Sequence, residues 1–203
     1  MLNKNNNVIK QEQDNSKPKN SRINIYIDTE TGGLSPLEHD VLTFAVLAEK
    51  EDEQILKIQY NILGDPLRVT KESLEINNIN LEEHNKKALT KQEVKTHFLT
   101  TMKILKQNSN NIRFIGQNPM FDVRMLEHNI FKEQSPFREY PISDTVIMSK
   151  KYCAHTNITL PNHKLQTLSE HFGYDTVFHD AMNDVLATKH VYNTIKRKMM
   201  RNE

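Results

Sequence analysis

The chain has 203 residues, 36% hydrophobic and 26% charged, which fits one domain of ordinary size with its own core. No apolar run approaches the roughly 20 residues that span a bilayer, and no apolar stretch at the N-terminus resembles a secretory signal, so we expect neither a membrane protein nor a secreted one. The formal net charge of +1 argues against a protein that coats duplex DNA nonspecifically. The single cysteine excludes an intrachain disulfide and favours a cytoplasmic location.

The N-terminal segment differs in composition from the rest of the chain. Residues 1–21 are rich in Asn, Lys and Gln and hold almost no apolar side chains. Such a segment cannot bury enough apolar surface to offset the entropy of ordering. We therefore predict a disordered tail, either inert or a partner-binding arm, followed by one domain over residues 22–203.

Three strands are predicted at the start of this domain. The first alternates isoleucine with polar or aromatic residues over 23–27 and ends at a carboxylate, Asp28. Residues 41–48 indicate a largely buried second strand. Residues 54–63 indicate a third, with an apolar face made of Leu56, Ile58, Tyr60 and Ile62. The short connections predict an antiparallel meander.

Helical patterns dominate the second half of the chain. Thr90–Glu93 is a capping box, in which the Thr and Glu side chains each bond a free backbone N–H, and an apolar helical stripe follows it. Asn118 is a favourable N-cap and Pro119 a favourable first residue for a helix that runs to about Phe131. Asp180 is predicted to cap the last helix.

Shorter elements connect these helices. They are a strand over 112–116, a strand near 140–143, a helix from 145 that Asp144 caps, and a helix over 164–172 closed by Gly173. Strands first, then alternating helices and strands, indicate an α/β fold. We expect a mixed sheet of three antiparallel strands, then alternating helices and strands, with flanking helices.

Two carboxylates at the end of the first strand are the first candidate site residues. Asp28 and Glu30 are two positions apart, so the pleat points both side chains to the same face. Like charges this close repel unless a cation neutralises them. Thr31-Gly32-Gly33 follows and leaves room for a ligand to approach the backbone. Alone, this block fits a solvated strand end equally well.

Two further blocks add two carboxylates and a histidine. Asp122 falls in the first turn of the helix that starts at Pro119, and Asp184 lies one turn into the last helix. His179 stays in the preceding loop, where a pKa near neutrality suits proton transfer from water. Each block alone also fits an aspartate placed favourably at a helix N-terminus, or a surface histidine.

In this order, the three blocks resemble the DEDD superfamily of 3′→5′ exonucleases, of the DnaQ-like proofreading type, over roughly residues 22–197. The motifs Asp-x-Glu-Thr, Asn-x-x-Phe-Asp and His-x-Ala-x-x-Asp match at Asp28, Glu30 and Thr31, at Asn118, Phe121 and Asp122, and at His179, Ala181 and Asp184. The histidine indicates the DEDDh branch, because the sister DEDDy branch would have tyrosine at position 180. The chain departs from the family at Gln117, where many relatives have histidine, and at Asn78, where a family loop often has glycine.

The resemblance implies an RNase H-like fold and hydrolysis with two divalent ions, Mg²⁺ or Mn²⁺. It implies that Asp28 bridges both ions, that Glu30 and Asp184 complete the shell of one, and that Asp122 holds the other through water. His179 would take a proton from the attacking water. The implied substrate-binding residues are Thr31, Gly32, Leu34, Asn118 and Phe121.

Three hypotheses for function remain open at the level of sequence. The leading one is an exonuclease that releases nucleoside 5′-monophosphates from single-stranded 3′ ends of DNA, free-standing or as the proofreading partner of a separate DNA polymerase subunit. An exoribonuclease resembling RNase T or oligoribonuclease would use the same residues, since contacts to the 2′-hydroxyl are not visible in the sequence. A non-catalytic nucleic-acid-binding or polymerase-binding module is the third, and the intact set of acids argues against it.

Two weaker constellations are interpreted as structural. Cys153, His155 and His163 lack the paired spacing of a zinc site and are expected to be ordinary loop residues. The basic C-terminal end, Lys196–Lys198 and Arg201, is interpreted as a solvated helix end rather than a phosphate-binding segment.

Overall fold

The computed structural model describes residues 21–201. The predicted tail therefore lies, except for Ser21, outside the described residues. Among the residues described, no helix is both long and apolar enough to cross a membrane.

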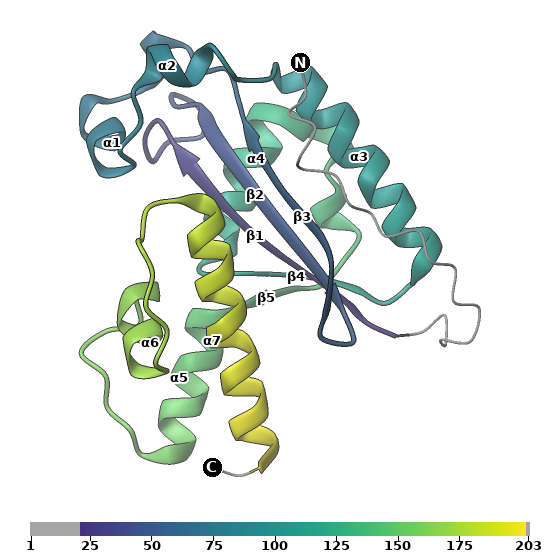
Figure 1. Cartoon of the computed structure of the whole chain (residues 1–203), viewed down its shortest axis with the longest axis vertical. Helices are drawn as coiled ribbons and strands as arrows, with labels where there is room; N and C mark the ends of the chain where they lie inside the picture. The colour runs from purple at the N-terminus through teal and green to yellow at the C-terminus, as the bar shows by residue number, and fades with distance from the viewer. Residues whose placement is uncertain (1–20, 202–203) are drawn as a thin grey trace.

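The centre of the fold is one five-stranded sheet in the order β3-β2-β1-β4-β5 (Figure 1). The strands are β1 (Ile23–Thr31), β2 (Val41–Lys50), β3 (Glu53–Asn61), β4 (Ile112–Gly116) and β5 (Ile142–Asp144). The first three pair antiparallel, β4 pairs parallel with β1, and β5 pairs parallel with β4. The predicted meander and mixed sheet are confirmed, and the third strand ends two residues earlier than predicted.

Helices cover both faces of the sheet because both faces are apolar. Ile25 and Ile27 point to the face covered by α3 (Lys91–Asn108) and α4 (Pro119–Leu126). Tyr26, of opposite parity, points to α7 (Ala181–Arg201) on the other face (Figure 1). By the same alternation, the β1 carboxylates Asp28 and Glu30 lie on the face of Tyr26, toward α7.

The predicted helices are present. Thr90 and Glu93 form the capping box of α3, and α4 continues as a π-helical segment, η2 (Glu127–Phe131), to the predicted end. The remaining helices are α5 (Thr145–Thr156) and α6 (Leu165–His171), which pack against α7. Cys153 is buried within α5, which also holds His155, so both lie in a helix and not in the expected loop.

Three short elements between β3 and α3 were not predicted. They are η1 (Pro66–Arg68), α1 (Lys71–Ile76) and α2 (Leu81–Asn85), each with a side-chain cap at its start. Together they lie beyond the C-terminal end of β1 (Figure 1), where the Asn77 amide donates to the Thr31 carbonyl at 3.1 Å. Asn78 has a φ of 52°, the left-handed conformation that a glycine would take most easily.

Candidate active site

The end of β1 extends past its neighbour β4. The two strands pair from Ile23 with Ile112 to Tyr26 with Ile115, and β4 ends at Gly116. Gly116 is tightly enclosed, since a Cβ there would lie 2.7 Å from the Cβ of Pro119. The chain therefore turns at once into α4, and the last residues of β1 have no strand beside them on this edge.

Asp28 and Glu30 occupy this end of β1 and share the parity of Tyr26, so they face α7 as the alternation predicted. Asp184 meets them from the first turn of α7. Each of the three offers a carboxylate oxygen, and these oxygens lie within 4.8 Å of one another. This is the one group of at least three metal-ligating side chains found among residues 21–201.

The start of α7 is fixed by Asp180. Its side chain accepts a hydrogen bond from the Asn183 N–H at 3.0 Å, and its carbonyl accepts one from the Asp184 N–H at 2.9 Å. The predicted N-cap is thus confirmed. Oδ1 of Asp184 is buried and has no hydrogen-bond partner in the described part of the chain. A buried carboxylate oxygen that receives no hydrogen bond is well placed to ligate a cation.

Asp122 approaches from the opposite side of the sheet. It is only 4% exposed, in the first turn of α4, and its Oδ1 accepts a hydrogen bond from the Thr29 hydroxyl at 2.7 Å. Thr29 lies between Asp28 and Glu30 and therefore points to the other face, toward α4. Asp122 is not within the close group of three, but its charge acts on Asp28.

Asn118 occupies the predicted N-cap position of α4, but its side chain does not cap the helix. It has a φ of 54°, in the left-handed region, and its side chain makes no capping hydrogen bond. Its backbone N–H instead donates to Oδ1 of Asp144 at 3.1 Å, and the same oxygen accepts the Val146 N–H at 2.8 Å. Asp144 therefore caps α5, as expected, and also positions the start of α4.

Burial raises the pKa of all four carboxyl groups, and repulsion by nearby carboxylates adds to this effect. The pKa of Asp28 is raised well above its usual value by burial and then by the charges of Asp122, Asp184 and Glu30. Burial is also the main cause of the raised pKa of the other three carboxyl groups. These pKa values rise to about 8 for Glu30, about 7 for Asp122 and about 6 for Asp184. Bound cations would offset this repulsion and favour the ionised form of the carboxyl groups.

His179 lies in the loop before α7, as predicted. Its side chain is exposed, its φ is 64°, and its backbone N–H donates to Oδ2 of Asp184 at 3.3 Å. This hydrogen bond lowers the pKa of Asp184, against the larger effect of burial. The histidine is therefore next to the carboxylates and open to solvent.

The predicted substrate-binding residues differ in exposure. Leu34 is 83% exposed and Asn118 is exposed, whereas Phe121 is half-buried against the core. Thr31 is buried, and its hydroxyl donates to the Gly33 carbonyl at 2.8 Å. Gly32 is enclosed by the chain itself, as a Cβ there would lie 2.6 Å from the Arg68 carbonyl oxygen.

Sequence reasoning missed three contributors to the site. Thr29 was not singled out, although the alternation of β1 places it on the face where α4 carries Asp122. Asp180 was predicted only as a cap, yet its charge also raises the pKa of Glu30 and of Asp184. Gln117 was considered only as a departure from the family pattern, but its amide donates to the His163 carbonyl at 2.7 Å and so connects the α5–α6 loop to the start of α4.

The comparison with known families agrees with this geometry. A family model described as Exonuclease (RNase_T) matches residues 25–192, which include all five predicted catalytic residues. The chain belongs to this exonuclease family. The family recognition made from the three motifs is thereby confirmed. No curated protein matches the chain.

Several solved exonuclease I structures share the fold. A product-bound exonuclease I has a TM-score of 0.73 at 17% identity and matches 90% of this chain and 45% of its own. The zinc-bound complex of E. coli exonuclease I with single-stranded DNA has a TM-score of 0.71 at 18% identity, with coverages of 90% and 42%. Exonuclease I from Methylocaldum szegediense has a TM-score of 0.72 at 19% identity, with coverages of 89% and 41%. The RNase H-like fold is thus confirmed, and the chain spans less than half the length of these proteins.

Proposed function

We propose that residues 22–203 form a metal-dependent 3′→5′ exonuclease that releases nucleoside 5′-monophosphates from single-stranded DNA. The observation that carries the proposal is the cluster of Asp28, Glu30 and Asp184, whose oxygens lie within 4.8 Å of one another. Acids this close and this buried are unfavourable for a protein that only binds phosphate, because they would repel it. They are favourable for a protein that places cations between itself and a phosphodiester.

The donor set fits hard divalent cations. All the donors are carboxylate oxygens, which Mg²⁺ and Mn²⁺ prefer, and the partnerless Oδ1 of Asp184 offers a free ligand position. Asp28, Glu30 and Asp184 would hold one ion, and Asp122 would hold a second together with Asp28. When bound, the two ions stabilise charge on the phosphate and lower the pKa of a nearby water.

The remaining steps use side chains of the chain itself. His179 is exposed beside the carboxylates and would accept the proton of the attacking water. The exposed Leu34 and the half-buried Phe121 would contact the terminal base. Apolar contact of this kind does not depend on the identity of the base. The backbone at Thr31 and Gly32 would border the terminal nucleotide.

Single-stranded DNA is favoured as substrate because exonuclease I proteins of the same fold were solved with it, one of them with a zinc ion. An exoribonuclease is the alternative, and the choice depends on contacts to the 2′-hydroxyl. A polymerase partner has no support in the comparisons and is not part of this proposal.

The test is end-labelled hydrolysis. Strands of DNA and RNA labelled at the 3′ or 5′ end would be incubated with Mg²⁺, Mn²⁺ or EDTA. The wild type would be compared with Asp28→Asn and with Asp175→Asn, which removes an exposed loop carboxylate. We expect mononucleotides released from the 3′ end, lost in EDTA and in Asp28→Asn but kept in Asp175→Asn.

Faster release from RNA than from DNA would select the exoribonuclease. Intact binding without release under any metal condition would contradict the enzyme proposal and favour a binding module.

A further inference from the structure

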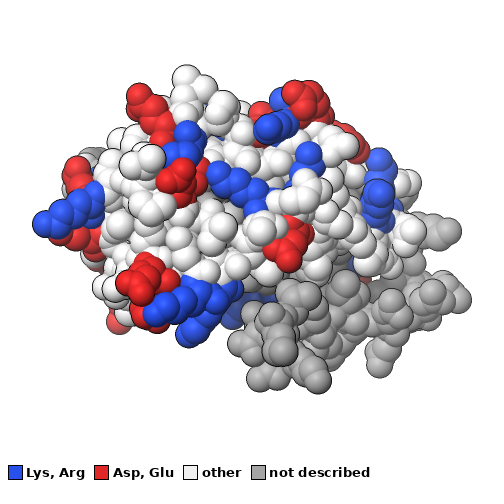
Figure 2. Space-filling model, turned by 90° about the horizontal axis from the view of Figure 1, so that it is seen from above, with Lys and Arg blue, Asp and Glu red and all other residues white. Residues whose placement is uncertain are grey.

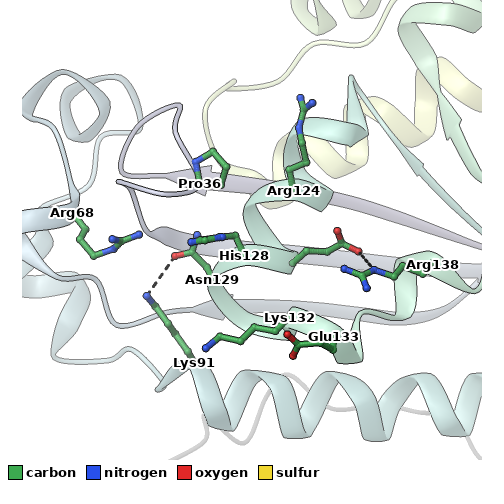
Figure 3. Close-up of a pocket in the computed structure, with 10 residues that line it drawn as sticks. Pro36, Arg68, Lys91, Arg124, His128, Asn129, Lys132, Glu133 and Arg138 are labelled. Atoms are coloured by element: carbon green, nitrogen blue, oxygen red, sulfur yellow. Dashed lines mark hydrogen bonds and ion pairs between the residues drawn. The ribbon is translucent and has the colours of Figure 1, made fainter.

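The surface charge of the protein is mixed. On the face that Figure 2 shows, basic and acidic side chains are interspersed among uncharged ones. Because the net charge is only +1, phosphate binding away from the catalytic carboxylates requires a local concentration of cations. One such concentration lines a pocket of about 850 Å³ on the α3–α4 side of the sheet (Figure 3).

We propose that this pocket holds the sugar-phosphate backbone of the substrate strand on the 5′ side of the scissile bond. We call it the basic groove and define it by its five cationic lining residues: Arg68, Lys91, Arg124, Lys132 and Arg138. This inference rests on the proposed exonuclease function and adds to it a second contact region for the same strand.

The groove and the catalytic carboxylates share the helix α4. Arg124 follows Asp122 by two residues on α4, so their backbones are roughly 3 Å apart along the helix axis. Pro36, which also lines the pocket, belongs to the loop that follows β1 directly. The backbone of Arg68 lies against Gly32, the residue after the end of β1. A strand that continues from Asp122 along α4 would enter the groove.

The groove keeps an excess of positive charge after its own ion pairs are counted. Its five cations face two lining carboxylates, Glu127 and Glu133, which leaves three positive charges, and the buried Asp40 beneath them reduces the excess to two. Arg138 pairs with Glu127 at 2.9 Å. Arg68 and Lys91 share Asp40, each at 2.7 Å.

Arg124 and Lys132 are the cations best placed to bind a ligand. Both are exposed, and neither has an ion pair among the described residues, whereas the other three do. Arg124 lies in α4 and Lys132 directly follows η2, and Figure 3 shows the two at opposite ends of the pocket. Such a separation suits successive charges along a backbone better than one compact anion.

The border of the groove adds apolar surface of the kind that bases use. Leu37 follows Pro36 and is 69% exposed, and Leu67 precedes Arg68 and is 92% exposed. The two segments are joined, since the Arg68 guanidinium donates to the Leu37 carbonyl at 3.0 Å. Cations along a groove with exposed apolar side chains beside them are typical of sequence-independent binding of single strands.

The experiment separates the groove from the cluster by substrate length. The variant is Arg124→Gln/Lys132→Gln, and the matched control is Lys196→Gln/Arg197→Gln, which removes the same charge from α7 on the other face. Anisotropy in EDTA would measure binding of a labelled strand of roughly 20 nucleotides at several salt concentrations. Kinetics with Mg²⁺ would compare that strand with a dinucleotide.

We expect the groove variant to bind the long strand roughly 10-fold more weakly near physiological salt and to lower its salt slope by about 1.4, or about 0.7 for each lost phosphate contact. Dinucleotide turnover should stay at the wild-type rate, and the control should match the wild type.

An equal loss on the dinucleotide, an equal loss in the control, or unchanged binding would each overturn the inference. Inhibition of hydrolysis by inorganic phosphate would be measured as well. If the groove variant were inhibited less than the wild type but bound the strand equally well, the pocket would be a small-anion site and the inference would be wrong. The anisotropy measurement needs no catalysis, so it tests the groove even if the wild type hydrolyses nothing. An absence of hydrolysis would contradict the proposed function but not the groove.

Discussion

The hydroxyl of Thr29 links two elements that carry separate parts of the site. It stands between Asp28 and Glu30 in β1, points to the other face, and donates to Asp122 of α4 at 2.7 Å. Without this donor, the pKa of Asp122 would rise further, because the hydrogen bond opposes the effect of burial. Thr29 thus positions the Asp122 carboxylate through its hydroxyl.

Replacing Thr29 with valine should therefore weaken metal binding while preserving the shape of the side chain. We expect the Mg²⁺ concentration for half-maximal activity to rise by about 10- to 100-fold, as for other groups that orient a ligand. Thr29→Ser retains the hydroxyl and should remain near the wild type. Activity measured against Mg²⁺ concentration gives the comparison, and equal behaviour of the valine and serine variants would contradict this role.

At the scale of elements, Asp40 joins three segments behind the site. Its carboxylate is buried and accepts from Arg68 of η1, from Lys91 at the start of α3, and from the Asp65 N–H at 3.1 Å. Its carbonyl accepts the Gly32 N–H at 2.8 Å. The pKa of Asp40 is lowered because the bonds from Lys91 and Arg68 outweigh its burial.

Asp40→Asn keeps the shape but leaves both cations without their anion. We expect a loss of about 2 kcal/mol in the free energy of unfolding, below the value for a fully buried pair because Arg68 and Lys91 are 32% and 35% exposed. The exposed pair of Lys106 and Glu139 offers a control, and Glu139→Gln should change stability by less than about 0.5 kcal/mol. Urea unfolding near pH 7 measures both, and similar losses in the two variants would show that Asp40 is not such an anchor.

How far the sequence predicted each element depends on where its stability originates. The strand β4 and the helix α3 carry strong local signals, an apolar run and a capping box, and both were predicted. The helices α1 and α2 bury no side chain fully and are held by contacts distant in sequence, such as the Asn85 amide with Gly64 at 2.9 and 3.0 Å. No periodic pattern marks such helices.

The same distinction applies to the site. The shared face of Asp28 and Glu30 follows from the pleat of one strand, and the place of Asp184 follows from a cap and one helical turn. The left-handed Asn118 does not follow from its own segment, because its N–H is bonded by Asp144, 26 residues away. Local chemistry thus predicted the candidate ligands, and tertiary contacts determine how their side chains are oriented.

At the scale of the whole molecule, the site opposes the stability of the fold unless cations are bound. In the folded state Asp184 and Glu30 hold protons up to pKa values of about 6 and about 8, whereas the unfolded chain loses them near 3.8 and 4.5. Between these values the folded state binds more protons, so the free energy of unfolding falls as the pH rises. The fall should extend from about pH 4 to about pH 8.

Thermal unfolding in EDTA across this range should therefore show a melting temperature that decreases with pH. Saturating Mg²⁺ should reverse the decrease at pH 8, with about 2.7 kcal/mol of stabilisation when its concentration is 100 times the dissociation constant. Asp184→Asn should melt higher than the wild type in EDTA at pH 8 and respond less to Mg²⁺, because it removes both the repulsion and a ligand. A melting temperature that rises with pH over this window, or a full Mg²⁺ response in Asp184→Asn, would show that the carboxylates do not act as one cation-dependent unit.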